Sequence, residues 1–312
     1  MKIGLDIMGG DFAPEAAVKG AILAAKLLSS EQRIVLIGDQ EIAHRLIEQA
    51  GEDPAFFDYV HAPEVISMGE HPTKAIAKKP NSSISRGFQL LQAGEIDSFS
   101  SAGSTGAMLV GAVFSVKTIP GVHRPAIATN VPKIKSGSGL LLDVGANADC
   151  KPEMLAQFGL LGSLYMEHVN GVNQPTVGLL NIGEEEEKGN LLTQAAYPLL
   201  KENKRINFIG NIEGRDVFDD RVDVIVADGF SGNIVLKMAE SFYAVTKRKG
   251  FKDEFFDRFN FEQYGGVPVL GVNAPVIIGH GISNPEAIKS MILLSKTMID
   301  SQVVEKMRSA FN

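Results

Sequence analysis

The feature that most constrains the fold is an alternation of short apolar runs with helical segments, which recurs along the whole chain. Runs such as residues 140–142 and 176–180 are apolar without interruption, as expected of strands that are covered on both faces. Turn residues follow each run, and a helical pattern follows each turn. About eight such units predict an α/β fold with a mostly parallel, doubly wound sheet and helices on both faces.

Composition limits the class of protein. With 312 residues, of which 45% are hydrophobic, the chain can bury a large core, and we expect one α/β/α domain over residues 1–312. No apolar run approaches the roughly 18 residues of a membrane span, and residues 1–6 read as a strand, which favours a cytoplasmic protein. The net charge of −7 argues against a general nucleic-acid binder. Cys150 is the single cysteine, so no internal disulfide is expected.

A strand-to-helix turn at residues 101–106 outlines an anion site. Residues 96–100 read as a strand, 103–106 as a tight turn and 107–116 as a helix. The first N–H groups of such a helix lack intrahelical partners and carry the positive end of the helix dipole. They therefore point at whatever lies above the turn.

A second turn of similar sequence follows the strand predicted at residues 222–226. Gly229-x-Ser231-Gly232 repeats the spacing of Gly103-x-Thr105-Gly106. We therefore expect two turns of one design that hold two reacting groups in one cleft. The alternative is that both are ordinary turns, in which glycine supplies positive φ and a hydroxyl caps the helix.

Polar residues and glycines gather where the predicted strands end. In doubly wound sheets, ligands bind beyond the carboxyl ends of the strands, although Asn and Asp are also common turn formers. The rim predicted in this way contains Asp6, Gly9, Gly10, Asp11, Ser101, Gly103, Ser104, Thr105, Gly106, Asp143, Asn147, Asn181, Gly183, Asn211, Glu213, Asp228, Gly229, Ser231, Gly232 and Asn233.

Several chemistries have no motif in the chain. The sequence lacks a phosphate-binding loop ending in Gly-Lys-Ser/Thr, a Gly-x-Gly-x-x-Gly after a strand, a His-Glu-x-x-His and a Gly-x-Ser-x-Gly elbow. Cys150 has no evident flanking base, and we expect it to be structural. His280, between two glycines at a strand end, is either a donor at the rim or a packed histidine.

Six blocks in register resemble the bacterial phosphate acyltransferase family of phospholipid synthesis. They are LDIMGGD at 5–11, SAGSTGA at 101–107, LDVGAN at 142–147, GLLNIG at 178–183, FIGNIE at 208–213 and DGFSGN at 228–233. The resemblance implies transfer of a long-chain fatty acyl group from acyl-acyl-carrier-protein to inorganic phosphate, which gives acyl phosphate. It also implies a homodimer with a three-layer α/β/α fold similar to those of phosphotransacetylases and of isocitrate and isopropylmalate dehydrogenases, without a metal or cofactor.

The resemblance also suggests roles for the rim. Phosphate can itself be the nucleophile, so no covalent enzyme intermediate is needed. We expect Thr105, Ser231, Asn233 and Asn147 to be catalytic, with hydroxyls and backbone N–H groups as donors. The remaining rim residues, with Lys151 and His280, would bind phosphate and the acyl group, and the aspartates would orient loops. The alternative for Lys151 is a role at the surface, without contact to phosphate.

A basic surface is needed to dock an acidic carrier protein. Candidates are Lys78, Lys79 and Arg86, or Lys247 and Arg248 with the basic residues up to Lys252. The latter belong to an aromatic and basic helical segment at about 241–264, which includes Phe261 and is shorter than the helical hairpin of the family. We expect it to line the path of the acyl chain or to form a dimer contact. Peripheral contact with a membrane, and with a membrane glycerol-3-phosphate acyltransferase, follows from the resemblance.

Three other functions compete with this interpretation. The first is a phosphotransacetylase-like enzyme that uses short acyl-coenzyme A. The second is a nicotinamide-dependent decarboxylating dehydrogenase, which would need arginines on the substrate carboxylates, and the rim has few. The third is a non-catalytic scaffold, which leaves the two glycine turns unexplained.

Overall fold

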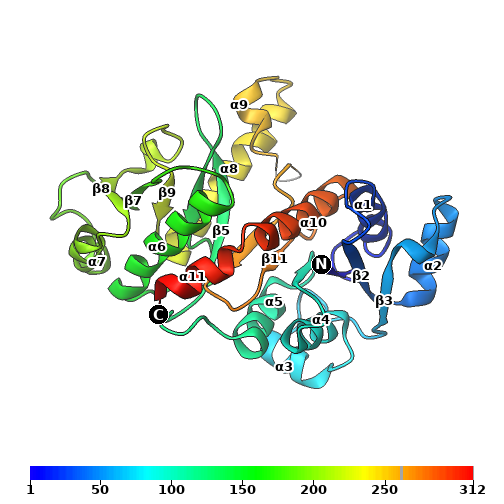
Figure 1. Ribbon diagram of the computed structural model, residues 1–312. Helices are drawn as coiled ribbons and strands as arrows, with labels where there is room; N and C mark the ends of the chain where they lie inside the picture. Colours follow the sequence, from blue (N-terminus) through cyan, green and yellow to red (C-terminus); the bar gives the residue numbers. More distant parts are fainter. Residues whose placement is uncertain (261–262, 312) are drawn as a thin grey trace. The chain divides into compact units, whose positions relative to one another are not determined.

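The computed structural model describes residues 1–260 and 263–311, which pack into two compact units. The first unit comprises residues 1–118 and 263–300, and the second comprises 119–260 and 301–311. Each unit contains strands and helices of its own (Figure 1). The single domain expected from the sequence stays a prediction.

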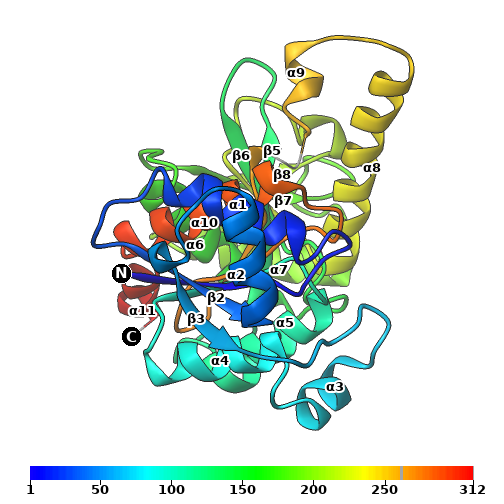
Figure 2. The same cartoon turned by 90° about the vertical axis from the view of Figure 1, so that its right-hand side faces the viewer.

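The strands of the first unit are parallel except for one pair. Its strand order is β3 (Asp58–His61), β2 (Arg33–Gly38), β1 (Lys2–Asp6), β4 (Ser98–Ser101), β11 (Val276–Ile278) and β10 (Val267–Leu270), and only the β10–β11 pair is antiparallel. Helices α1 (Glu15–Ala25) and α10 (Pro285–Asp300) cover one face, and α4 (Ser83–Ala93) and α5 (Thr105–Gly111) cover the other (Figures 1 and 2). The unit also contains α2 (Gln40–Gln49), α3 (Pro72–Lys78), a 3₁₀ turn (Pro54–Phe56) and a π-helical turn (Ala112–Val116).

The second unit repeats this plan. Its strand order is β5 (Ala126–Pro132), β6 (Ser138–Leu142), β9 (Val224–Val226), β7 (Thr176–Leu180) and β8 (Asn207–Ile212), and only β5 and β6 are antiparallel. Its helices are α6 (Pro152–His168), α7 (Leu191–Glu202), α8 (Gly229–Arg248), α9 (Glu254–Asp257) and α11 (Val303–Phe311), with a 3₁₀ turn at Gly214–Asp216. Helix α8 runs on into a hairpin with α9 (Figure 2).

The predicted α/β fold with a mostly parallel sheet is confirmed. Two elements differ from the expectation. Strand β10 was not predicted, and residues 285–311 form two helices, α10 and α11, in place of one continuous helix. Between them Gln302 adopts a left-handed φ of 52°, and a right-handed helix cannot continue through such a residue.

Apolar strands form the core, and small residues let helices approach them. The side chains of β6 from Leu140 to Leu142 are fully buried, as predicted from their uninterrupted apolar run. On α4, a Cβ added to Gly87 would overlap the ring of Phe99 on β4. A larger residue at this position would push α4 away from the strand that carries the first glycine turn.

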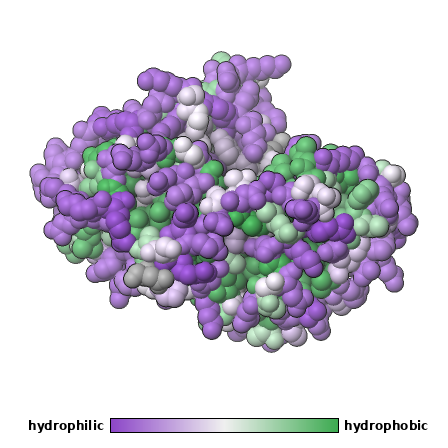
Figure 3. All heavy atoms as spheres, viewed as in Figure 1, coloured by the Kyte–Doolittle hydropathy of each residue, from purple (hydrophilic) through white to green (hydrophobic). Residues whose placement is uncertain are grey.

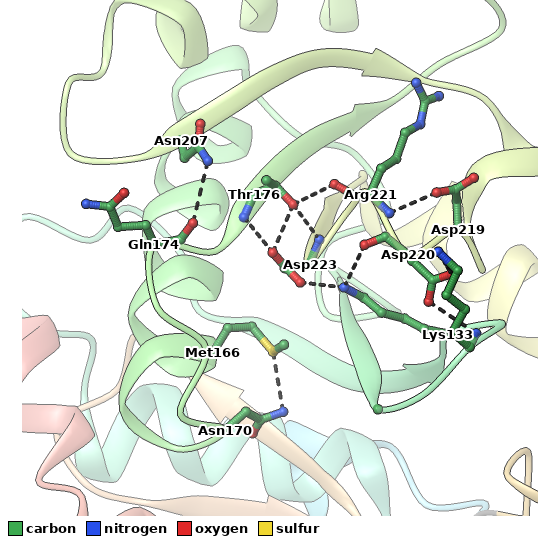
Figure 4. Close-up of polar contacts among 12 residues, drawn as sticks. Lys133, Met166, Asn170, Gln174, Thr176, Asn207, Asp219, Asp220, Arg221 and Asp223 are labelled. Atoms are coloured by element: carbon green, nitrogen blue, oxygen red, sulfur yellow. Dashed lines mark hydrogen bonds and ion pairs between the residues drawn. The ribbon is translucent and has the colours of Figure 1, made fainter.

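An ion-pair network fixes the amino ends of β7 and β9, at the edge away from the predicted rim. Lys133 pairs with Asp223, and Asp223 accepts hydrogen bonds from the N–H and the hydroxyl of Thr176 (Figure 4). Burial alone would raise the pKa of Asp223, but the hydrogen bonds from Lys133 and Thr176 outweigh it and hold the pKa below its ordinary value. This edge is therefore structural.

The described helices were compared with the requirements of a membrane span. Among the described residues, no helix combines the length and the apolar character needed to cross a bilayer. On the face that Figure 3 shows, hydrophobic side chains lie in patches separated by hydrophilic ones.

Candidate active site

The first glycine turn joins β4 to α5 and leaves backbone donors open. Ser104 is the N-cap of α5, and its Oγ accepts the N–H of Ala107 at 3.4 Å. The N–H groups of Thr105 and Gly106, the first two helical residues, donate to no atom of the described chain. The positive end of α5 is therefore capped by a neutral side chain and carries two open donors.

A buried carboxylate supports this turn from the neighbouring strand. The Ser101 hydroxyl donates to Asp6 Oδ2 at 2.6 Å, and Ser101 Oγ accepts the Gly103 N–H at 2.9 Å. Burial raises the pKa of Asp6, and hydrogen bonds from Ser101 and Ser83 offset this only in part. Because the Ser101 hydroxyl donates its hydrogen bond to Asp6, this serine connects the turn to the end of β1.

Close packing explains the glycines of this region. A Cβ on Gly9 would lie 2.6 Å from both Asp6 Oδ2 and the Gly103 nitrogen, and one on Gly106 would overlap the ring of Pro72. Gly10 has a φ of 107°, which side chains rarely adopt. These residues are glycines because neighbouring loops touch their backbones.

The structure brings three predicted segments of the first unit together. Strands β1, β4 and β11 are mutually parallel neighbours, so their carboxyl ends share one edge. Across this edge the Asp11 N–H donates to the Gly281 carbonyl at 2.7 Å. His280 is half-buried beside it, and its Nδ1 lies 3.5 Å from the Ile282 nitrogen.

The second glycine turn has a different electrostatic character. Asp228 is the N-cap of α8, and its Oδ1 accepts the Ser231 N–H at 2.8 Å. The Ser231 hydroxyl donates to Asp228 Oδ2 at 2.9 Å. The Gly229 N–H donates to the Asn147 carbonyl at 2.8 Å. A carboxylate thus occupies the positive end of α8 and repels other anions.

The expectation that both turns share one design is wrong. Gly103 precedes the N-cap of α5 and Thr105 is the first helical residue, whereas Gly229 is the first residue of α8 and Ser231 the third. The N-cap side chain decides where a helix begins, and Asp228 starts α8 at Gly229. The equal spacing in sequence therefore falls at different positions on the two helices.

A second buried carboxylate holds the loop beneath α8. Asp143 accepts backbone N–H groups from Ile127, Gly145, Ala146 and Asn147. Burial raises its pKa, and these hydrogen bonds offset the effect only in part. A Cβ on Gly232 would overlap the carbonyl oxygen of Asp143, so the start of α8 packs directly on this loop.

The two asparagines predicted to be catalytic hold the same loop. Asn147 Nδ2 donates to Asp143 Oδ2 at 2.9 Å and to the Pro125 carbonyl at 2.8 Å. Asn233 Nδ2 donates to the Val144 carbonyl at 2.8 Å. Both amides position the start of α8 in this structure.

A cavity of about 370 Å³ opens at the carboxyl ends of β7 and β9 in the second unit. Its lining includes three predicted site residues, Asn181, Asp228 and Ser231. Its other members were not predicted from the sequence. They are Leu155, Leu179, Leu180, Ile182, Gly189, Asn190, Thr193 and Ala227. Asn190 caps α7 through the Thr193 N–H, and an Asn directly before an apolar helical pattern was the signal available in the sequence.

The remaining predicted rim residues of the second unit have structural partners or lie exposed. Asn211 is buried and donates to the Glu185 carbonyl at 2.8 Å, and Glu213 pairs with Arg215 at 2.7 Å. Gly183 is buried against the side chain of Lys188. Lys151 lies exposed at the start of α6. Binding of substrate by these residues stays a prediction.

Cys150 lies half-buried near the start of α8. Burial raises the pKa of its thiol to about 11, and the nearby carboxylates of Asp143 and Asp228 act in the same direction. The thiolate needed for nucleophilic attack is therefore scarce near neutral pH, as expected for a structural cysteine.

Some of the basic residues considered for docking bond to neighbouring side chains, and others are exposed. Lys79 donates to Glu70 Oε1 at 2.6 Å and Arg86 to Gln89 Oε1 at 3.0 Å, whereas Lys78 is exposed. Lys247 and Arg248 are exposed at the last turn of α8.

The aromatic segment at about 241–264 is divided in its contacts. The rings of Phe255 and Phe259 pack with Phe218, and Phe256 packs against both of them. Phe251, in contrast, is 67% exposed. Phe261, part of the same prediction, lies outside the described residues.

Comparisons with known proteins agree with this architecture. A phosphotransacetylase from Streptococcus pyogenes matches with a TM-score of 0.68 at 18% identity, over 98% of this chain and 94% of that one. The EutD phosphotransacetylase from Staphylococcus aureus matches with a TM-score of 0.65 at 18% identity, over 96% and 94%. At this level of identity the matches establish the fold.

Sequence comparisons establish the family. The curated phosphate acyltransferase of Pelotomaculum thermopropionicum is 45% identical over 99% of this chain and 95% of its own length. That of Dictyoglomus turgidum is 40% identical over 100% and 98%. The model of the family described as "Fatty acid synthesis protein" matches residues 1–306. The chain belongs to this family, as the six sequence blocks indicated.

Proposed function

We propose that the protein is an acyltransferase that moves a long-chain fatty acyl group from acyl-acyl-carrier-protein to inorganic phosphate. The products are acyl phosphate and free carrier protein. Relatives named phosphate acyltransferase and a fold shared with phosphotransacetylases support this proposal. The observation that carries it is the turn at residues 104–106, with its open N–H groups and neutral cap.

Phosphate is assigned to this first turn. The backbone donors of Thr105 and Gly106 and the exposed Thr105 hydroxyl present hydrogen bonds at the positive end of α5. The start of α8 is unsuitable for phosphate because the Asp228 carboxylate already lies there. The acyl donor is therefore assigned to the second turn, where Ser231 supplies a hydroxyl.

The reaction balances without an enzyme nucleophile. A phosphate oxygen attacks the thioester carbonyl, a C–O bond forms and the C–S bond breaks. The proton of hydrogen phosphate passes to the departing thiolate. Thr105 donates a hydrogen bond that orients the attacking phosphate. Each such donor contributes about 10² to 10³ in rate where one has been removed.

The remaining parts of the proposal concern partners. Exposed Lys78, Lys247 and Arg248 offer charge complementarity to an acidic carrier protein. A homodimer, a cytoplasmic location with peripheral membrane contact, and delivery of acyl phosphate to a membrane glycerol-3-phosphate acyltransferase complete the proposal.

The test is incubation with palmitoyl-carrier protein, with and without phosphate, followed by assay of acyl phosphate and released carrier. Phosphate-dependent formation of both is expected. A second candidate is a phosphotransacetylase acting on short acyl-coenzyme A, which the structural neighbours favour. Fast turnover of acetyl-coenzyme A, with none of the long-chain carrier, would select it instead.

A further inference from the structure

The cavity of about 370 Å³ in the second unit has an apolar floor and a polar edge. Leu155 and Leu179 are fully buried in its floor, Leu180 is half-buried, and Ile182 is 80% exposed in its wall. Its size falls at the lower end of the roughly 300–1,000 Å³ of ligand sites.

Most polar side-chain groups of the lining already bond to the protein. Asn190 Oδ1 accepts the Thr193 N–H, and the Thr193 hydroxyl donates to the Asn190 carbonyl. Asn181 Nδ2 donates to the Lys188 carbonyl. Both oxygens of Asp228 are engaged by Ser231.

These contacts determine which class of ligand the cavity can bind. A ligand rich in hydrogen-bonding groups would have to compete with bonds already made, and an anion would meet the Asp228 carboxylate. An alkyl chain forms no hydrogen bonds and has no charge, so it neither competes with these bonds nor is repelled by Asp228. By covering Ile182 it also removes apolar surface from water.

We infer that this cavity binds the acyl chain of the donor next to its thioester and sets the preferred chain length. The inference rests on the proposed function. It assigns the chain to the ends of β7 and β9, and not to the aromatic segment at about 241–264.

Two variants test the assignment. Leu180→Phe fills the cavity, and Ile182→Ala removes a wall at an exposed position where folding is not at risk. The measurement is kcat/KM for acyl-carrier proteins with chains of 8, 12 and 16 carbons, with KM for phosphate measured in parallel. Each buried methylene is worth about fourfold.

In Leu180→Phe, the preference for 16 over 8 carbons should fall at least about tenfold, because at least two methylenes lose their place. In Ile182→Ala, KM for the 16-carbon donor should rise roughly fourfold or more. KM for phosphate should stay unchanged in both variants.

The matched control is Leu191→Ala. Leu191 is 87% exposed and follows Asn190 in the chain, but it does not line the cavity. Its chain-length profile should equal that of the wild type.

Failure of the inference and failure of the proposed function give different results. A wild type that makes acyl phosphate, with unchanged profiles in both cavity variants, overturns the cavity assignment alone. If the chain-length profile changes in Phe242→Ala and not in the cavity variants, the acyl chain is assigned to the aromatic segment. A wild type that makes no acyl phosphate from any carrier donor overturns both. If Leu180→Phe does not fold, Ile182→Ala decides.

Discussion

The two glycine turns have the same spacing in sequence and opposite character in the structure. At α5 a serine caps the helix and two N–H groups stay open, whereas at α8 an aspartate caps the helix and bonds Ser231. The residue that caps a helix therefore tells more about anion binding than the glycines that follow it. Four predictions test the difference between the two regions.

The largest effect is expected from Ser104→Asp, which gives the first turn the cap of the second. Aspartate caps helices as well as serine does, so stability should change little. Its charge close to bound phosphate costs up to about 4 kcal/mol at an effective dielectric constant near 20. We expect KM for phosphate to rise at least about 100-fold.

The measurement for Ser104→Asp is initial rate against phosphate concentration. Ser104→Asn, a neutral cap of similar quality, is the matched control and should keep KM for phosphate within a few fold. An unchanged KM in Ser104→Asp would move phosphate away from α5.

The second prediction concerns the packing of α8. In Gly232→Ala the new Cβ overlaps the carbonyl oxygen of Asp143, so the helix must shift from its supporting loop. We expect a loss of about 3 kcal/mol in the free energy of unfolding, measured by urea denaturation. Gly214→Ala, where a Cβ meets nothing within 4 Å, should change stability by less than about 1 kcal/mol.

The third prediction compares the two buried carboxylates. Asp143→Asn places an amide opposite the N–H and Nδ2 of Asn147, which both donate to Asp143 Oδ2. It should cost about 2 kcal/mol in unfolding free energy. Asp6→Asn should cost less, since two of the groups that bond Asp6 are the rotatable hydroxyls of Ser101 and Ser83, which can turn to suit an amide. Equal losses would contradict this ranking.

The smallest effect is expected for pH dependence at the opposite edge. The pKa of Asp223 is lowered in the folded protein, so its contribution to stability is present above the unfolded pKa of about 3.9. That contribution is lost as pH falls through the lower folded pKa. Urea titrations from pH 6 to pH 2 should show a flatter loss of stability in Asp223→Asn than in the wild type.

Much of the fold could be predicted because buried strands consist of uninterrupted apolar residues. The strands at Lys2–Asp6 and Thr176–Leu180 begin and end where the sequence indicated. Strand β10 was missed because Pro268 interrupts its pattern.

The site was predicted only in part. The sequence located the polar ends of the strands, since turn residues follow apolar runs. It could not tell whether Ser231 begins α8 or lies in its first turn, because that depends on Asp228 acting as the cap. It also missed Thr193, which reaches the cavity from a helix whose start is set by Asn190.

The division of the chain between the units has a consequence for biosynthesis. Residues 1–118 include β1 to β4, but β10, β11 and α10 of the same unit come from residues 263–300. A ribosome must therefore translate most of the message before the earliest segment obtains its last strands. A fragment that ends at residue 118 should precipitate or be degraded when it is expressed alone. Co-expression with the remainder of the chain should stabilise it, because β10, β11 and α10 can then pack against it.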